Sequence, residues 1–204
     1  THASLMCRVN TDIPSLLNVN NVSLRQVAAR RIEINGALKV VSDYLADPVR
    51  NRDRPGGVPV RITRTIFPSV KLPVMCERYE MENTGPKPVA LSIPEFSQVF
   101  TSPQEKGVGG SYLIRADIQG SGHYVLQPGE RVVFDAVFQA YAKSGGESLR
   151  PDVGSEYAAR MSFVANEIDA RLILETPDEI INTQFRYAKI RAAESIYKTK
   201  GGYM

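Results

Sequence analysis

An Asn-Gly pair at positions 35 and 36 is the feature that most restricts how this chain folds. Before the pair, residues 31–34 alternate between charged and apolar side chains, and the same alternation resumes over residues 38–40. Alternation with a period of two is typical of half-exposed β-strands, and Asn-Gly favours tight hairpin turns because both residues tolerate positive φ. The pattern predicts a β-hairpin in which Asn35 and Gly36 both have positive φ.

The same period recurs along the first two-thirds of the chain. Alternation on both sides of the turn residues 83–86 predicts a second hairpin over residues 75–93. Residues 132–140 predict a long strand with Phe134 and Phe138 on one face, in the core. Residues 101–123 are polar and glycine-rich and are predicted to form a loop. Strands joined by short turns favour an antiparallel β-sandwich over parallel βαβ units.

Towards the C-terminus the period changes from that of a strand to that of a helix. Apolar residues spaced i, i+4, i+7 and i+11 from Tyr157 predict a short helix near residues 155–167. Residues 172–174, Leu-Ile-Leu, predict one more short strand. Thr176 with Glu179 matches a capping box, and Pro177 suits the first helical position, so a longer helix is expected to begin here. Its apolar face comprises Ile181, Phe185, Ala188, Ala192 and Ile196. The predicted fold class is mainly β, an antiparallel β-sandwich with helical segments near the C-terminus.

Composition removes several classes of protein. The 204 residues carry 25 basic and 22 acidic side chains, a net charge of +3 that is too small for a nucleic-acid-binding surface. No apolar run approaches the roughly 18–20 residues that span a membrane. The two cysteines, Cys7 and Cys76, are interpreted as free buried thiols, with a single disulfide as the open alternative.

Residues with catalytic chemistry are few. The two histidines, His2 and His123, are too far apart in sequence to suggest a zinc site, and no Gly-x-Ser-x-Gly motif accompanies them. The glycines at 107–110 match no nucleotide-binding spacing. One predicted strand carries Glu77, Glu80 and Glu82, with Glu77 facing opposite to the other two. Such a run of carboxylates on a half-exposed strand is interpreted as solvated rather than catalytic. No catalytic residue, metal site or cofactor is predicted.

Three stretches, taken in order, resemble a known family. They are Arg64–Ser69 followed by a strand that ends in Glu82-Asn83-Thr84-Gly85, then Leu126–Glu130 before the long strand, then Leu174–Asn182 opening the last helix. This series is similar to the N-terminal β-supersandwich domain and linker of six-hairpin glycoside hydrolases, whose catalytic domain is an (α/α)₆ toroid. The resemblance covers residues 20–200, and it implies a β-sandwich domain over residues 1–175 and the first helix of a truncated toroid over 176–204.

The resemblance also implies a function. We expect a non-catalytic N-terminal domain of a bacterial glycoside hydrolase or related carbohydrate-active enzyme, inactive alone, which supports the catalytic toroid. Its partners would be the downstream (α/α)₆ domain and the carbohydrate substrate of the parent enzyme. Loop residues Tyr112, Arg115 and His123 are the candidates for bordering the sugar cleft. A chain that starts at Thr1 and ends at Met204 is interpreted as trimmed at both ends, and the expected location is secreted or periplasmic.

Two alternatives stay open. The first is an independent β-sandwich module that binds a glycan or a protein through its loops. The second is a complete small enzyme on a jelly-roll scaffold, using carboxylates that converge in a pocket. The last helix distinguishes the first alternative from a truncated domain, because only a finished module buries the helix's apolar face.

Overall fold

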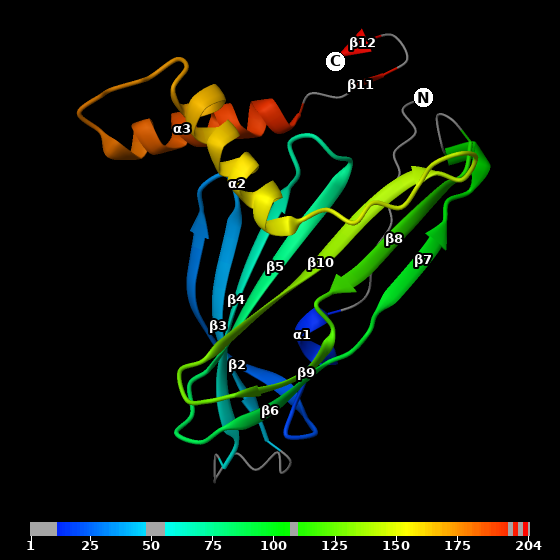
Figure 1. Cartoon of the computed structure of the whole chain (residues 1–204). Coiled ribbons are helices and arrows are strands. Elements are labelled where there is room, and N and C mark those ends of the chain that lie inside the picture. Colours follow the sequence, from blue (N-terminus) through cyan, green and yellow to red (C-terminus); the bar gives the residue numbers. More distant parts are fainter. Residues whose placement is uncertain (1–11, 48–55, 107–109, 196–197, 200–201, 204) are drawn as a thin grey trace.

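The computed structural model describes residues 12–47, 56–106, 110–195, 198–199 and 202–203. In these ranges ten strands form one curled antiparallel sheet in the order β7-β8-β10-β5-β4-β3-β2-β1-β6-β9 (Figure 1). The strands of this sheet are β1 (Asn18–Val19), β2 (Val22–Ile34), β3 (Leu38–Ala46), β4 (Val58–Pro68), β5 (Val74–Asn83), β6 (Val89–Ile93), β7 (Ser97–Thr101), β8 (Tyr112–Gln119), β9 (Gly122–Leu126) and β10 (Arg131–Ala142). The predicted mainly antiparallel β fold with helices near the C-terminus is confirmed.

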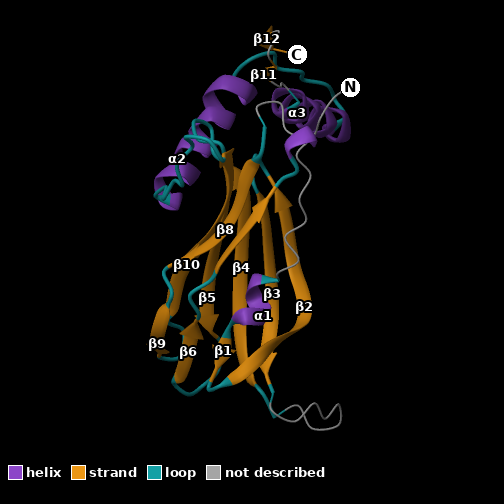
Figure 2. Ribbon diagram, turned by 90° about the vertical axis from the view of Figure 1, so that its right-hand side faces the viewer, coloured by secondary structure: helices purple, strands orange, loops and turns teal. Residues whose placement is uncertain are grey.

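The remaining elements are short helices and one small ribbon. They are α1 (Ile13–Leu16), the 3₁₀ turn η1 (Gln104–Lys106), α2 (Val153–Phe163), the π-helix η2 (Val164–Asp169), α3 (Glu179–Glu194), and the paired strands β11 (Lys198–Thr199) and β12 (Gly202–Tyr203). Figure 2 shows α2 and α3 together at one end of the sheet, above the ends of the long strands. The helix predicted near residues 155–167 is therefore present, as α2 continued by η2.

The β2–β3 hairpin forms where the Asn-Gly pair predicts it. Ile34 pairs with Leu38, so the connection has three residues, 35–37. Gly36 has a φ of +76°, whereas Asn35 does not take a positive φ, and the expectation that both residues do so is wrong for Asn35. A two-residue turn of this type needs positive φ at both residues, whereas a connection of three residues does not.

The hairpin predicted over residues 75–93 does not form. Strand β5 pairs with β4 and β10, whereas β6 pairs with β1 and β9. The fully buried Asn83 directs the chain away from β5: its Nδ2 donates to the carbonyls of Lys87 (2.8 Å) and Leu126 (3.0 Å), and its Oδ1 accepts from the amide of Gly85 (2.9 Å). This side chain ties the turn to β9, so the strand after it belongs to the other part of the sheet.

The main core lies where the sheet curls over itself. The short strands β1, β6 and β9 contribute apolar side chains that pack with those of β4, β5 and β10. At its centre, Phe134 and Tyr79 stack with ring centroids 5.0 Å apart. Phe138 is half-buried and packs against the same core, which confirms the predicted face of this strand. The two layers of the predicted sandwich are thus parts of one curled sheet.

A second, smaller core lies on the outer face of the sheet beneath α2. It comprises Phe67, Val74, Cys76, Val137 and Val153. Asp152 caps α2 by accepting from the amide of Gly154, and Tyr157 packs edge-on against Phe67 with centroids 5.3 Å apart. Because α2 covers this region, both faces of β4, β5 and β10 are buried near that end.

Strand β2 forms an edge of the sheet over most of its length. Within the described residues β1 pairs with β2 only at Val22 and Ser23, which leaves residues 24–33 without a second strand. The pairing of β2 with β3 shifts register twice, between Gln26 and Ala28 and between Ala29 and Arg31. Such irregularities bend a strand and increase its twist.

Candidate functional site

Helix α3 begins differently from its prediction. Asp178, not Thr176, is the N-cap, and its side chain accepts from the amide of Ile180 at 2.8 Å. Thr176 instead pairs with Asn182: the amide of Thr176 donates to the Asn182 Oδ1 (2.9 Å), and the Asn182 Nδ2 donates back to the Thr176 carbonyl (3.0 Å). The predicted capping box is therefore wrong, because an Asp nearer the helix is an equally good cap and leaves Thr176 free to close the turn.

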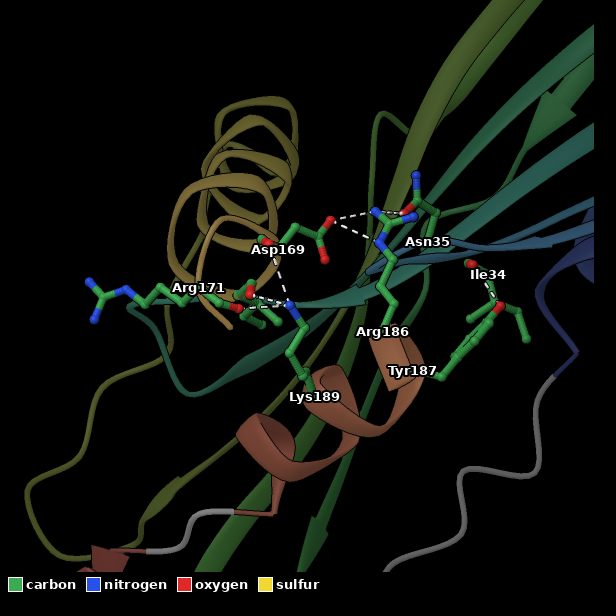
Figure 3. Close-up of polar contacts among 8 residues, drawn as sticks. Ile34, Asn35, Asp169, Arg171, Arg186, Tyr187 and Lys189 are labelled. Atoms are coloured by element: carbon green, nitrogen blue, oxygen red, sulfur yellow. Dashed lines mark hydrogen bonds and ion pairs between the residues drawn. The ribbon is translucent and has the colours of Figure 1, made fainter. Parts of the chain in front are cut away.

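The polar side of α3 docks the helix on the rest of the molecule (Figure 3). The guanidinium of Arg186 donates to the carboxylate of Asp169, with its Nε at 3.0 Å, and through Nη2 to the Oδ1 of Asn35 at 2.6 Å. The hydroxyl of Tyr187 donates to the carbonyl of Ile34 at 2.7 Å. These bonds join α3 to η2 and to the tip of the β2–β3 hairpin.

Lys189 makes the next contact along the helix. Its ammonium group donates to the carbonyls of Ile168 (2.8 Å), Asp169 (3.3 Å) and Arg171 (2.8 Å) at the end of η2. The carbonyls at the C-terminal end of a helix lack intrahelical partners and carry partial negative charge, so a cation there satisfies both needs. The hydrogen bond from Arg186 holds the pKa of Asp169 below its ordinary value of 3.8.

Arg160 joins α2 to the hairpin tip and to α3. Its side chain is buried; the Nε donates to the carbonyl of Gly36 at 2.8 Å, and the guanidinium forms an ion pair with Glu194 of α3. A Cβ on Gly36 would lie 2.6 Å from the Cγ2 of Val164, so only glycine fits at this tip. We call α2, η2 and α3 the helical layer; the hairpin tip is its anchor.

The predicted apolar face of α3 is mostly turned to solvent. Ile181 is 46% exposed, Ala188 and Ala192 are exposed, and Phe185 is half-buried, while Ile196 lies outside the described residues. The residue of the helix that is buried is Ile190, which packs with Val164 and Ile168 of η2. The helix thus docks through its polar contacts and Ile190, while Ile181, Ala188 and Ala192 of the predicted apolar face are exposed.

Apolar side chains just before α3 are exposed as well. Residues 172–174 do not form the predicted strand; Leu172 and Ile173 are 74% and 68% exposed, and Leu172 has a φ of +51°. Ile180, in the first turn of α3, is 67% exposed. We call the exposed side chains of Leu172, Ile173, Leu174, Ile180 and Ile181 the apolar segment. Concentrated exposure of large apolar side chains marks interaction surfaces in folded proteins.

The three residues predicted to border a sugar cleft are not brought together. Residues 101–123 hold η1, the whole of β8 and the start of β9 rather than a loop, and residues 107–109 lie outside the described part. Tyr112 begins β8 and pairs with Ala142, so both residues lie on the inner face of the sheet, whereas Arg115 lies on the outer face. His123 is exposed on β9, in the other layer, opposite Ser92.

Arg115 lines a cleft of about 620 Å³ on the outer face of the sheet. Its Nε donates to Asp117 Oδ2 at 2.5 Å. The hydrogen bond to the Asp117 carboxylate raises the pKa of Arg115 above its ordinary value. The start of β7, with Glu95, forms one wall, and Leu149 and Arg150 form another. No sequence motif predicts this cleft, because it depends on the register of β7 with β8 and on a distant segment.

The carboxylates of β5 do not converge. Glu77 is buried and accepts from Arg64, whose Nη2 lies 2.6 Å from its Oε1, and from the hydroxyl of Tyr79. Glu80 and Glu82 lie on the opposite face, where both pair with Arg131. The predicted opposite orientation of Glu77 is confirmed, and the convergent pocket that a jelly-roll enzyme would need is not formed by these three residues.

Neither a metal-binding cluster nor a membrane-spanning helix is found in the described ranges. No three or more His, Cys, Asp or Glu side chains gather there in a way that could hold a metal ion. None of the described helices is long and apolar enough to cross a membrane. No known protein-family model, curated protein or solved structure matches the chain.

Proposed function

We propose that this chain is the non-catalytic N-terminal domain of a bacterial glycoside hydrolase or related carbohydrate-active enzyme, secreted or periplasmic. Its β-sandwich supports a helical catalytic domain that packs on the helical layer. The ordered motifs in residues 64–85, 126–140 and 174–182 suggest this enzyme class. The exposed apolar face of α3 favours a helical domain as the partner that packs on it.

The orientation of α3 is the observation that carries the proposal. An isolated amphipathic helix is expected to place its apolar stripe on the core and its charges in water. Here Arg186 and Lys189 face the molecule, while Ile181, Ala188 and Ala192 face solvent. This arrangement is expected of a helix that lies between two domains and offers its apolar side to the second one.

The anchoring contacts suit such a supporting role. Arg160, Arg186 and Tyr187 each bond to the β2–β3 tip, at Gly36, Asn35 and Ile34. Three bonds from two helices to one turn fix the direction in which α3 leaves the sheet. A domain packed on α3 would therefore take a defined position relative to the β-sandwich.

Side-chain footprinting tests this role. The protein made from its complete coding sequence is labelled with a diffusible carbene, in parallel with residues 1–204 alone. The apolar segment should lose most of its labelling in the complete protein, because the catalytic domain covers it. Val125 and Val133, 67% and 46% exposed on strands remote from α3, serve as controls and should label equally in both.

Two results would overturn the proposal. One is equal labelling of Leu172–Leu174, Ile180 and Ile181 in both proteins. The other is a complete coding sequence that has no helical-hairpin domain after residue 204. Either result would favour an independent binding module, the second candidate function, for which the cleft at Arg115 is the specific observation.

A further inference from the structure

The cleft beside Arg115 is built by three segments that are distant in sequence. Ser97 of β7 pairs with Asp117 of β8, which brings Glu95 and Phe96 to one side of the cleft. The third segment is held in place by Gln139, whose Oε1 accepts from the amide of Leu149 at 2.7 Å and whose Nε2 donates to its carbonyl at 3.0 Å. Gln139 is buried, so the wall that carries Arg150 is fixed to the sheet.

The charges of the cleft balance. Arg115 and Arg150 supply two positive charges, and Glu95 and Asp117 supply two negative ones. A site for phosphate or another polyanion collects positive charge without nearby carboxylates. The balance instead suits an uncharged ligand with many hydrogen-bonding groups. Its volume of about 620 Å³ lies within the roughly 300–1,000 Å³ of small-ligand sites.

Arg115 and Asp117 offer a donor and an acceptor side by side. They lie two residues apart on the same face of β8, and their side chains are 29% and 19% exposed. The Arg115 guanidinium already bonds to Asp117 and to the side chain of Tyr141, but a guanidinium has five N–H groups, and a carboxylate can accept several hydrogen bonds. Two neighbouring hydroxyls match this pair, because one donates to the carboxylate while the other accepts from the guanidinium.

We propose that this cleft binds a neutral oligosaccharide, with Arg115 and Asp117 holding two adjacent hydroxyls of one sugar residue. The choice of carbohydrate among polyhydroxylated ligands rests on the proposed function. Ser97, Ser121 and Gln119 supply further polar groups along the cleft. The site lies on the outer face of the sheet and adds a second carbohydrate contact to that of the catalytic domain.

The test is a titration of the ¹⁵N-labelled 204-residue chain with neutral gluco-, xylo-, manno- and galacto-oligosaccharides, followed by NMR. At least one series should shift the amides of Arg115, Asp117, Gly120 and Ser121 in a saturable manner. Arg115→Gln and Asp117→Asn should each weaken that binding about tenfold or more, equivalent to about 1.4 kcal/mol. Arg131→Gln removes an arginine that pairs with Glu80 and Glu82 outside the cleft, and should leave binding unchanged.

Several outcomes would refute the site. One is the absence of shifts at the cleft in every neutral series at millimolar concentration. Another is binding by both cleft variants that is as tight as that of the wild type, and a third is shifts only with oligogalacturonate, a charged comparator. Thermal melting of each variant shows whether it is folded before binding is compared. Binding at the cleft together with a fully labelled apolar segment in the complete protein would keep the site while rejecting the supporting role, so the two proposals fail separately.

Discussion

The thiol of Cys76 lies in the small core under α2, fully buried and free. Burial, aided by the charges of Glu156 and Asp135, raises its pKa from 9.0 to about 11. At pH 8 the thiolate, which is the reactive form, is then about a hundredfold scarcer than at a pKa of 9.0. In a Cys7→Ser variant we expect iodoacetamide to label Cys76 very slowly in the native protein and rapidly in urea. Equal rates in the two states would contradict the burial of this thiol.

The Asp169–Arg186 pair predicts a pH dependence for the docking of α3. The folded-state pKa of Asp169 is lowered, first by the hydrogen bond from Arg186, so the pair contributes stability above about pH 3.8. That contribution is lost as the pH falls through the lower, folded-state pKa. The difference in melting temperature between the wild type and Asp169→Asn should be constant near neutrality and shrink below about pH 3.8. Arg186→Gln should show the same shrinking difference, whereas a difference that persists to the most acidic pH would refute the linkage.

At the scale of the element, the register of β10 sets which side chains reach the main core. Phe134 is 1% exposed and stacked on Tyr79, whereas the neighbouring Val133 is 46% exposed on the other face. Phe134→Ala should lower the free energy of unfolding by about 3–5 kcal/mol, the usual cost for a buried phenylalanine. The control, Val133→Ala, should cost less than about 1 kcal/mol. Urea denaturation measures both, and the reverse order would mean that the strand is inverted.

The helical layer depends on Arg160. Arg160→Met keeps most of the side-chain volume but leaves the Gly36 carbonyl and Glu194 without their donor. We expect a loss of about 1–3 kcal/mol, as for a buried hydrogen-bonding group left unpaired, and faster hydrogen exchange throughout α3. Arg191→Met, at an exposed position of α3, is the control and should change neither quantity. Unchanged exchange in Arg160→Met would show that other contacts alone hold the helix.

The sequence predicted those elements whose pattern is local. The β2–β3 hairpin, β10 and α2 each carry their own period and turn or cap residues, so their positions could be predicted. The crossover after Asn83 could not, because it depends on a carbonyl of Leu126 some forty residues away. The docked side of α3 was also missed: hydrophobicity favours burial of Ile181, whereas ion pairs and carbonyls of η2 determine the orientation. The cleft at Arg115 arises only from the register of β7, β8 and the segment around Leu149.

For the molecule as a whole, the proposed function predicts that residues 1–204 alone do not hydrolyse glycosides, because the acid–base pair would lie in the downstream catalytic domain. Among the carboxylates of β5, Glu77 is engaged by Arg64 and Tyr79, and Glu80 and Glu82 on the opposite face are both paired with Arg131, so none of the three is free to act as an acid or base across one bond. A panel of aryl glycosides and oligosaccharides should show no turnover above the buffer rate. Turnover that disappears in Glu77→Gln or Glu80→Gln would overturn this prediction.

Among the described residues no strand pairs with residues 24–33 of β2 on the side away from β3, and this open edge could pair with another copy of the molecule. A long unpaired strand can recruit another chain, and proteins avoid this with charges and irregular pairing. Residues 24–33 have both: two register shifts bend the strand, and Arg30 and Arg31 form ion pairs with Asp43 and Glu33 along it. A flat, regular partner strand cannot align with such an edge. Self-association into extended β-sheets through residues 24–33 is therefore disfavoured.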